Sequence, residues 1–352
     1  MGRNCRHAAQ LLPIPDGLTR LLRRYDAGMS FLALLFALLI EQVRPLAERN
    51  PVHQAMRQWA HWVSRTLDAG RAHQAWTIWG LTVGAPTLGA AAVHWALMWW
   101  VGWPVAMVWS IGILYATLGF RQFSHHFTEI RDALDTGDEN QVRERLAAWQ
   151  QVDASLVPRR ELLRHVIEFS ALAAHRHVFG VLAWFSVLAA LGLGPAGAVL
   201  YRMGEFVPRL WRRQAAVDTA PGLLNSEALS QVASQAWRRI DWVPARITAL
   251  AFAVVGNFEE AIDCWRNHAQ AFPDDNDGVV LAATSGAINV RLGGEALRPR
   301  SETLQPALGD SASTPGKEAE PGHLRTMVGL VWRTVVMWLV LLALLTLARL
   351  LG

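Results

Sequence analysis

The segment from Ala72 to Phe120 contains 49 residues and includes no Asp, Glu, Lys or Arg. A helix that crosses a bilayer needs about 20 apolar residues, so this segment is too long for one crossing and long enough for two. A break is expected near Gly102 and Pro104, because glycine permits a turn and proline lacks a backbone N–H donor. The segment therefore predicts a transmembrane hairpin.

Three other apolar stretches extend this interpretation. Met29 to Ile40 is short for a full crossing and no small-residue cleavage site follows it, so we expect an uncleaved first helix. Val178 to Tyr201 is interrupted from Gly192 to Pro195, and is either one kinked span or a re-entrant pair of half-helices. Thr326 to Ala348 is long enough to span the bilayer and predicts a C-terminal anchor.

The composition agrees with a membrane location. Apolar residues make up 52% of the chain and charged residues only 18%, below the quarter or so that is typical of soluble domains. The 17 tryptophans suit a membrane interface, although a large core would also use them. We predict an all-α, polytopic integral membrane protein with amphipathic connecting helices.

The connecting segments are rich in arginine. In the connector from Arg121 to His177, Pro158 separates two amphipathic stretches. Because a hairpin returns the chain to its starting side, this connector and the segment from Glu41 to Arg71 share one face of the membrane. Basic connectors favour the cytoplasmic side, so we expect a multi-pass protein whose connectors face the cytoplasm.

Several polar residues are candidates for chemistry. Glu161, His165 and Glu168 are spaced four and three apart, so on a helix they share one face and could bind a cation. A solvated helix face with ion pairs explains the same spacing equally well. His94 lies inside the charge-free segment beside tryptophans, and is either a polar site within the membrane or an interfacial residue.

Common catalytic and nucleotide-binding motifs are missing. The sequence has no GxxxxGK[ST] loop, no GxGxxG after a strand, no HExxH and no GxSxG. Its two cysteines, Cys5 and Cys264, are far apart and indicate neither a disulfide framework nor a zinc site. Any nucleotide chemistry would therefore need a less common scaffold.

Three ordered motifs resemble the CobD/CbiB family of cobalamin-biosynthesis membrane proteins. They are LGLGPAGAVLYRM from Leu191 to Met203, DWVPARITAL from Asp241 to Leu250, and SGAINVRLGG from Ser285 to Gly294. The similarity covers roughly Met29 to Gly294. The small residues of the last motif also suit close helix packing, so the motifs could reflect fold alone.

The resemblance implies a specific reaction. The family is associated with joining an aminopropanol unit to a carboxylate of adenosylcobyric acid, in an amide ligation that uses ATP and Mg²⁺. It implies a corrinoid small molecule and the lipid bilayer as partners, and no nucleic acid. Glu168, Glu205, Asn276 and Arg291 are expected to converge on one polar pocket at the cytoplasmic interface. The expected catalytic groups are Glu168 and Glu205, with Glu168 also the metal ligand, and the expected substrate-binding groups are His165, His175, Asn276 and Arg291.

The sequence departs from the family pattern at polar positions. Where the family shows a run like IESVAENTVDGV, residues Val166 to Val181 keep Ile167 and Glu168 but lose the second acid and its neighbouring Asn. The NTLD that follows the tyrosine turn is replaced by Gly204 to Val207. These losses leave an AmpE-like regulatory membrane protein as the alternative, and the corrinoid, the amine and the oligomeric state stay open.

The expected organisation has four parts. Residues 1–28 form an N-terminal extension, with Met29 a possible natural start, and residues 29–297 form the family-like membrane domain. Residues 298–323 are rich in Pro, Gly, Ser, Thr and Glu and predict a flexible linker. Residues 324–352 form the C-terminal transmembrane anchor.

Overall fold

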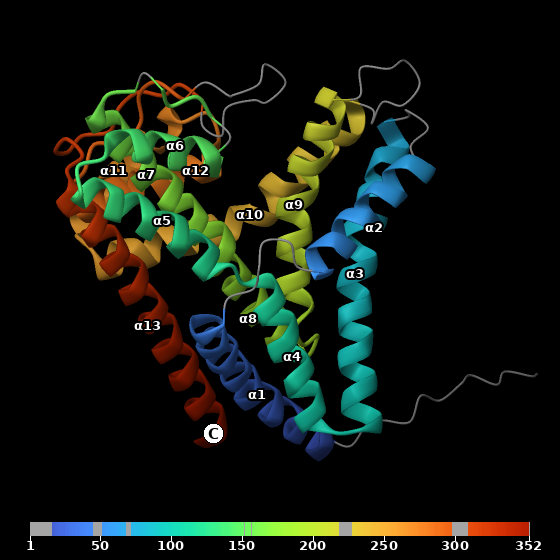
Figure 1. Cartoon of the computed structure of the whole chain (residues 1–352). Helices are drawn as coiled ribbons and strands as arrows, with labels where there is room; N and C mark the ends of the chain where they lie inside the picture. Colours follow the sequence, from blue (N-terminus) through green and yellow to red (C-terminus); the bar gives the residue numbers. More distant parts are fainter. Residues whose placement is uncertain are drawn as a thin grey trace, which may run out of the picture.

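The structure is a computed structural model that describes residues 16–44, 51–67, 72–150, 152–155, 157–217, 227–297 and 309–351. Within these ranges the regular elements are all helices, and they form two groups that stand apart at the top of the view and come together in its lower half (Figure 1). Three helical segments are long and apolar enough to cross a bilayer: His73–Trp100, Arg159–Ala190 and Pro321–Ala348. The prediction of an all-α membrane protein is confirmed.

The charge-free segment folds as a helical hairpin at the predicted place, and its first helix is long enough to cross a bilayer whereas its second is shorter. Helix α3 (Ala72–Trp100) and helix α4 (Trp103–Thr117) are joined by a two-residue break at Val101 and Gly102, where Gly102 has a φ of 109°. Pro104 lies in the first turn of α4, where its missing N–H would have no intrahelical partner. Trp99 and Trp100 at the turn are more than four-fifths exposed, as expected of side chains that face lipid or its interface.

The apolar stretch at Val178 to Tyr201 forms a pair of helices and not one kinked span. Helix α7 (Arg159–Ala174) continues through the π-helix η1 (His175–Phe179) into α8 (Gly180–Ala190), and after a turn α9 (Ala196–Val217) packs back along α8. The Trp95 indole N–H donates to the Gly192 carbonyl in this turn at 2.8 Å. Trp95 lies five residues, or about 8 Å, before the end of α3, so the turn stops short of the α3–α4 turn (Figure 1).

The remaining helices complete the fold. They are α1 (Asp16–Val43), α2 (Pro51–Leu67), α5 (Phe120–Asp135), α6 (Glu139–Gln150), α10 (Glu227–Val255), α11 (Phe258–His268), the short η2 (Ala269–Ala271), α12 (Asp275–Ile288) and α13 (Pro321–Leu351). The boundary expected between residues 28 and 29 falls inside α1. Only the last part of α1, from Ser30 to Val43, is an apolar helix, and it is shorter than a full span.

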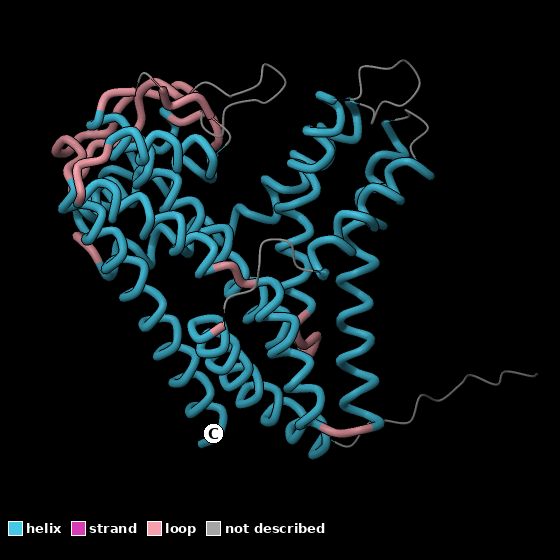
Figure 2. Tube along the Cα trace, viewed as in Figure 1, coloured by secondary structure: helices cyan, strands magenta, loops and turns pink. Residues whose placement is uncertain are grey.

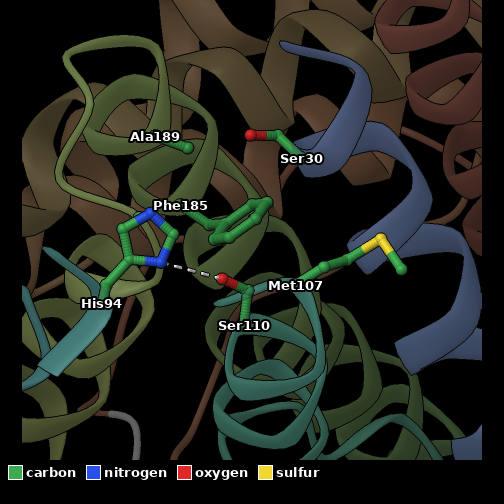
Figure 3. A pocket seen from close by; sticks show the side chains of 7 residues that line it. Ser30, His94, Met107, Ser110, Phe185 and Ala189 are labelled. Carbon is green, nitrogen blue, oxygen red and sulfur yellow. Dashed lines mark hydrogen bonds between the residues drawn. The ribbon is translucent and has the colours of Figure 1, made fainter. Parts of the chain in front are cut away.

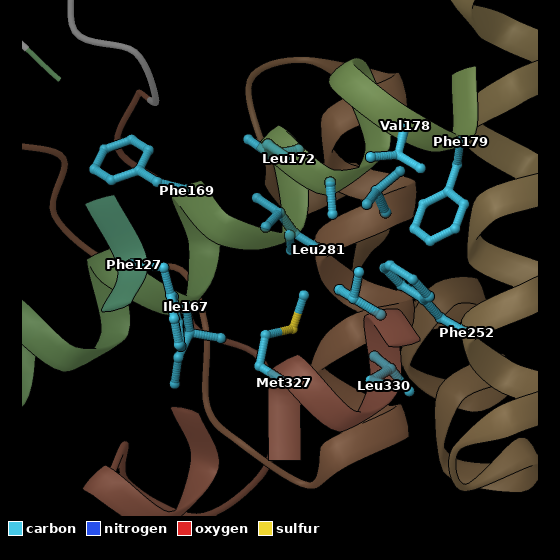
Figure 4. Packing of buried hydrophobic residues seen from close by; sticks show 14 of the residues in the cluster. Phe127, Ile167, Phe169, Leu172, Val178, Phe179, Phe252, Leu281, Met327 and Leu330 are labelled. Carbon is cyan, nitrogen blue, oxygen red and sulfur yellow. The ribbon is translucent and has the colours of Figure 1, made fainter. Parts of the chain in front are cut away.

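The core lies where α7, η1, α10, α12 and α13 meet. Figure 4 shows Phe179, Phe252 and Leu281 facing Met327 and Leu330 of the C-terminal helix. Burial of such side chains contributes about 1.5–3 kcal/mol each. The C-terminal helix is therefore part of the main core at its first half, and exposes an apolar surface from Val336 onward.

The connector after Pro158 differs from its prediction. Instead of an amphipathic surface helix, α7 is buried around its whole circumference from Leu162 to Leu172, including the charged Arg164 and Glu168. The stretch before Pro158 is two helices, α5 and α6, with a turn at Gly137. The polar residues misled the prediction because they pair with each other inside the protein instead of facing water.

The flexible linker expected at 298–323 is also corrected in part. Residues 298–308 lie outside the described residues, but residues 309–320 run along residues 289–296 as a loop layer at one end of the molecule (Figure 2). The Arg291 N–H donates to the Lys317 carbonyl at 2.7 Å, and the Thr314 N–H donates to the Leu292 carbonyl at 2.8 Å. Backbone pairing of this kind orders a segment whose side chains offer little apolar surface.

Candidate functional site

Polar side chains from η1, α9, α10 and α12 meet in one group inside the protein. We call this group the polar cluster, and its members are His175, Arg176, His177, Tyr201, Arg202, Glu205, Arg209, Asp241, Arg246, Asn276 and Asp277. Tyr201 belongs to the first family-like motif and Asp241 to the second. Segments far apart in the sequence therefore supply one site.

Three consecutive residues of the π-helix contact three different helices. His175 contacts Asp241 and Thr248 of α10, each at 2.9 Å, and Arg176 donates to Asp277 of α12. His177 receives a hydrogen bond at Nδ1 from Arg202 of α9, at 2.9 Å. Single π-turns inside α-helices often occur at functional sites. Here η1 is the structural centre of the polar cluster.

A buried triad forms one side of the cluster. The Tyr201 hydroxyl donates to Asp241 Oδ1 at 2.7 Å, and the same oxygen is 2.9 Å from His175 Nε2. Burial alone would raise the pKa of Asp241, but the charge and hydrogen bond of His175 and the hydrogen bond of Tyr201 outweigh it and hold the pKa below its usual value. The Tyr201 ring occupies space that Gly180 leaves open, because a Cβ there would lie 2.0 Å from Tyr201 Cζ.

The other side of the cluster is strongly basic. Arg202, Glu205 and Arg209 are spaced three and four apart on α9 and share one face, so both arginines pair with the single glutamate. Burial lowers the pKa of Arg202 to about 10, and nearby arginines add positive charge around the Arg209 side chain. Both side chains are cations at neutral pH, and their crowding favours an anion.

Asn276 and Asp277 of α12 form hydrogen bonds with the cluster residues of α10 and η1. Asn276 accepts from Arg246 at 3.1 Å and donates to the Arg238 carbonyl at 2.9 Å, so its amide joins α12 to α10. Asp277 accepts from Arg176, yet burial outweighs that charge and raises the pKa of Asp277 above its usual value. Asn276, expected to bind substrate, has both amide atoms engaged within the protein.

A second group of polar residues lies on α7. Glu168 Oε1 accepts from Arg164 at 3.0 Å and from the Gly293 N–H at 2.7 Å, and its Oε2 is 3.2 Å from His165 Nδ1. Arg164 also donates to Glu161 and to the Glu295 carbonyl. We call Glu161, Arg164, His165 and Glu168 the α7 network. Its hydrogen bonds to Gly293 and Glu295 hold the loop after α12 against the buried helix.

The predicted site residues do not all share one pocket. Glu205, His175 and Asn276 lie in the polar cluster, whereas His165 and Glu168 lie in the α7 network, two helical turns or about 12 Å from Arg176 along the same helix. Arg291 is exposed and belongs to neither group. The single convergent pocket expected from the resemblance is replaced by two adjacent networks.

The carboxylates do not fit a resident magnesium ion. Among the described residues, no group of three His, Cys, Asp or Glu side chains is placed to hold a metal. Both oxygens of Glu168 accept hydrogen bonds, and both oxygens of Glu205 face arginines. Glu161, His165 and Glu168 do share a neighbourhood, but the cation among them is Arg164.

The sequence alone did not single out most of the charged residues of the polar cluster. Arg176, Arg202, Arg209, Asp241 and Asp277 were not proposed as site residues, although each lies in or beside a segment that carried the family resemblance. The position of these residues in the sequence was the signal that could have identified them. Charged residues at the ends of apolar stretches and inside family-like motifs were the ones that the fold brought together.

His94 lies in a different, more apolar setting. It is buried against the α8–α9 turn, where Gly194 has a φ of +55° and a Cβ would lie 2.4 Å from the His94 ring. Its Nδ1 is 3.5 Å from the Ser110 hydroxyl, next to a cavity of about 10 Å³ that Ser30 and Phe185 also line (Figure 3). That volume holds about one water molecule, so the residue serves the packing of the turn.

Comparison with known proteins identifies relatives of most of the chain. The model of the family described as CobD/Cbib protein matches residues 31–208 and 231–348, which includes most of α13. A protein of Stutzerimonas stutzeri named cobalamin biosynthesis protein CobD is 28% identical over 317 residues, covering 89% of this chain and 96% of the relative.

Proteins of the same name from two other organisms give a similar result. The one from Chromobacterium violaceum is 31% identical over 201 residues, covering 56% of this chain and 60% of the relative. The one from Photorhabdus laumondii is 27% identical over 274 residues, covering 74% and 77%. No solved structure matches the chain. These relatives give the regulatory alternative no support.

Proposed function

We propose that this chain, which belongs to the CobD/CbiB family, acts in cobalamin biosynthesis and joins an aminopropanol unit to a carboxylate of adenosylcobyric acid. The observation that carries the proposal is the polar cluster. Two separate family-like motifs supply Tyr201, Arg202 and Asp241. The counter-ions of the arginines are Asp277 of α12 and Glu205 of α9. Motifs retained only for helix packing would not need hydrogen-bonded charges at their meeting point.

The chemistry of amide formation suits a basic site. A carboxylate must be activated before an amine can displace its oxygen, and we propose ATP as the activating substrate. Arginine binds phosphate and carboxylate oxygens with two parallel hydrogen bonds, so Arg176, Arg202 and Arg209 are the groups suited to the anionic substrates. Mg²⁺ is commonly bound mainly through substrate phosphates, which agrees with the lack of a resident site among the described carboxylates.

We further propose a multi-pass arrangement in the bacterial inner membrane, with the polar cluster on the cytoplasmic side. The support is the separation of surfaces along the molecule. Exposed tryptophan, valine and leucine side chains cover the α3–α4 turn and the second half of α13, whereas the arginines gather at the opposite half. A water-soluble corrinoid and ATP would reach the cluster from that basic side.

Binding to the detergent-purified full chain tests the proposal. Adenosylcobyric acid would be titrated with and without Mg-ATP, following the heat released and the corrinoid absorption band. We expect binding that Arg176→Gln weakens at least tenfold and that Arg291→Gln, outside both networks, leaves unchanged. Folded protein that binds no corrinoid would contradict the proposal, and equal losses in both variants would refute the assignment of the site.

A further inference from the structure

The basic side of the polar cluster has more cations than counter-ions. Arg176 pairs with Asp277, but Arg202 and Arg209 share the single carboxylate of Glu205. Arg213 lies one helical turn after Arg209 on α9 and adds a further cation to the same region. A buried charge without a partner is costly, so a set of this kind is stable only with an additional anion or with access to water.

The arginines are placed to receive such an anion. Arg202 is only 9% exposed, whereas the Arg209 side chain is about half exposed, so the set reaches from the interior to the surface. His177 adds a donor. Because Arg202 donates to its Nδ1, the proton of the neutral His177 ring is carried at Nε2.

Glu205 has the position of an internal counter-ion. Its side chain is 2% exposed, and it contacts one arginine with each carboxylate oxygen. The arrangement leaves Glu205 no role as a metal ligand, and it explains how two guanidinium groups stay close together when no ligand is bound. A ligand anion would take over part of this neutralisation.

We propose that Arg176, Arg202 and Arg209 form an oxyanion subsite in which Glu205 positions the two arginines of α9 and competes with the ligand for them. The ligand group is a phosphoryl or carboxylate oxyanion. The subsite rests on the proposed function only for the physiological source of that group, which is either a phosphate ester or a side-chain carboxylate of the corrinoid substrate.

The first test is thermal unfolding of the detergent-purified full chain in rising concentrations of inorganic phosphate, with chloride added to hold the ionic strength constant. We expect saturable stabilisation of the wild type. In Glu205→Gln the half-saturating phosphate concentration should fall about tenfold, as expected when a competing charged acceptor is removed. In Arg209→Gln, whose side chain is half exposed and whose folding is less at risk, the stabilisation should be lost.

Glu139→Gln is the matched control. Glu139 also pairs with two arginines, Arg143 and Arg159, but on the surface of α6. Its substitution should leave the phosphate response at the wild-type concentration. A wild type that phosphate stabilises no more than chloride, or a Glu205→Gln variant with unchanged or weaker affinity, would overturn the proposal.

A parallel titration with acetate identifies the source of the anion. Phosphate stabilisation that acetate does not reproduce indicates a phosphoryl group, and equal effects indicate a carboxylate; both results support the subsite. The proposed function is judged separately by corrinoid binding. A chain that binds phosphate in the expected way but binds no adenosylcobyric acid keeps the subsite and loses the cobalamin role.

Discussion

Substitution of Gly180 by alanine should disrupt the buried triad without touching any of its polar atoms. The added Cβ would lie 2.0 Å from Cζ and 2.1 Å from the hydroxyl of Tyr201, so the ring must move. Overpacking of a dense core costs about 1–3 kcal/mol. Displacement of the hydroxyl also breaks its bond to the Asp241 carboxylate, and a hydrogen bond to a charged group contributes about 1.5–3 kcal/mol.

The expected loss is therefore about 3 kcal/mol or more, read as a lower midpoint of thermal unfolding in detergent. Gly84→Ala is the matched control, because Gly84 is also inside a helix but nothing lies within 4 Å of its added Cβ. It should be neutral or stabilising by up to about 1 kcal/mol. Tyr201→Phe removes the hydrogen bond alone and should fall between the two. If Gly180→Ala is as stable as Gly84→Ala, the contact between Gly180 and Tyr201 does not exist.

Three further outcomes can be measured. Because the pKa of Asp241 is lower in the folded protein than in the unfolded chain, its ionised carboxylate stabilises the fold above about pH 4. This stabilisation is lost as the pH falls through the folded-state pKa, so the wild type and Asp241→Asn should become equally stable in acid. Glu168→Gln leaves its buried arginine partner without a full counter-charge and should cost about 3–5 kcal/mol by chemical unfolding, whereas Glu161→Gln at the exposed side of the same arginine should cost less than 1 kcal/mol. Thr314→Val removes the hydroxyl that the Leu292 N–H donates to, and should increase protease cleavage within residues 309–320, which Thr326→Val should not.

Periodicity and charge were sufficient for the membrane hairpin but not for α7. In the hairpin, 49 residues without charge and a Gly-Trp-Pro break leave few alternatives, and the break falls at the expected residues. In α7 the same reasoning placed Arg164 and Glu168 at a water-facing surface. Their burial depends on a partner loop more than 120 residues later, which supplies the Gly293 N–H. Local spacing carries no information about such a partner.

The assignment of Glu205 shows a related limit at the site. An acid near a family-like motif suggested catalysis, although the spacing of Arg202, Glu205 and Arg209 was already visible as one face of a helix. The missing information was burial. At the surface this spacing gives a weak ion pair, and inside the protein it gives a cluster whose charge must be balanced.

The motif from Leu191 to Met203 contributes both to the α8–α9 turn and to the polar cluster, and sequence comparison cannot separate these two roles. Its glycines form the α8–α9 turn, where the carbonyl of Gly192 receives the Trp95 indole, and its last residues, Tyr201 and Arg202, supply the polar cluster. The turn leads directly into α9, which carries Tyr201 and Arg202, so a shift of the turn relative to α3 moves the cluster residues with it. Trp95→Phe should therefore weaken binding of an anion at Arg202 as well as stability, whereas a motif kept only for packing would lose stability alone. This coupling distinguishes a retained site from a retained fold, because only a site has a ligand whose affinity can change.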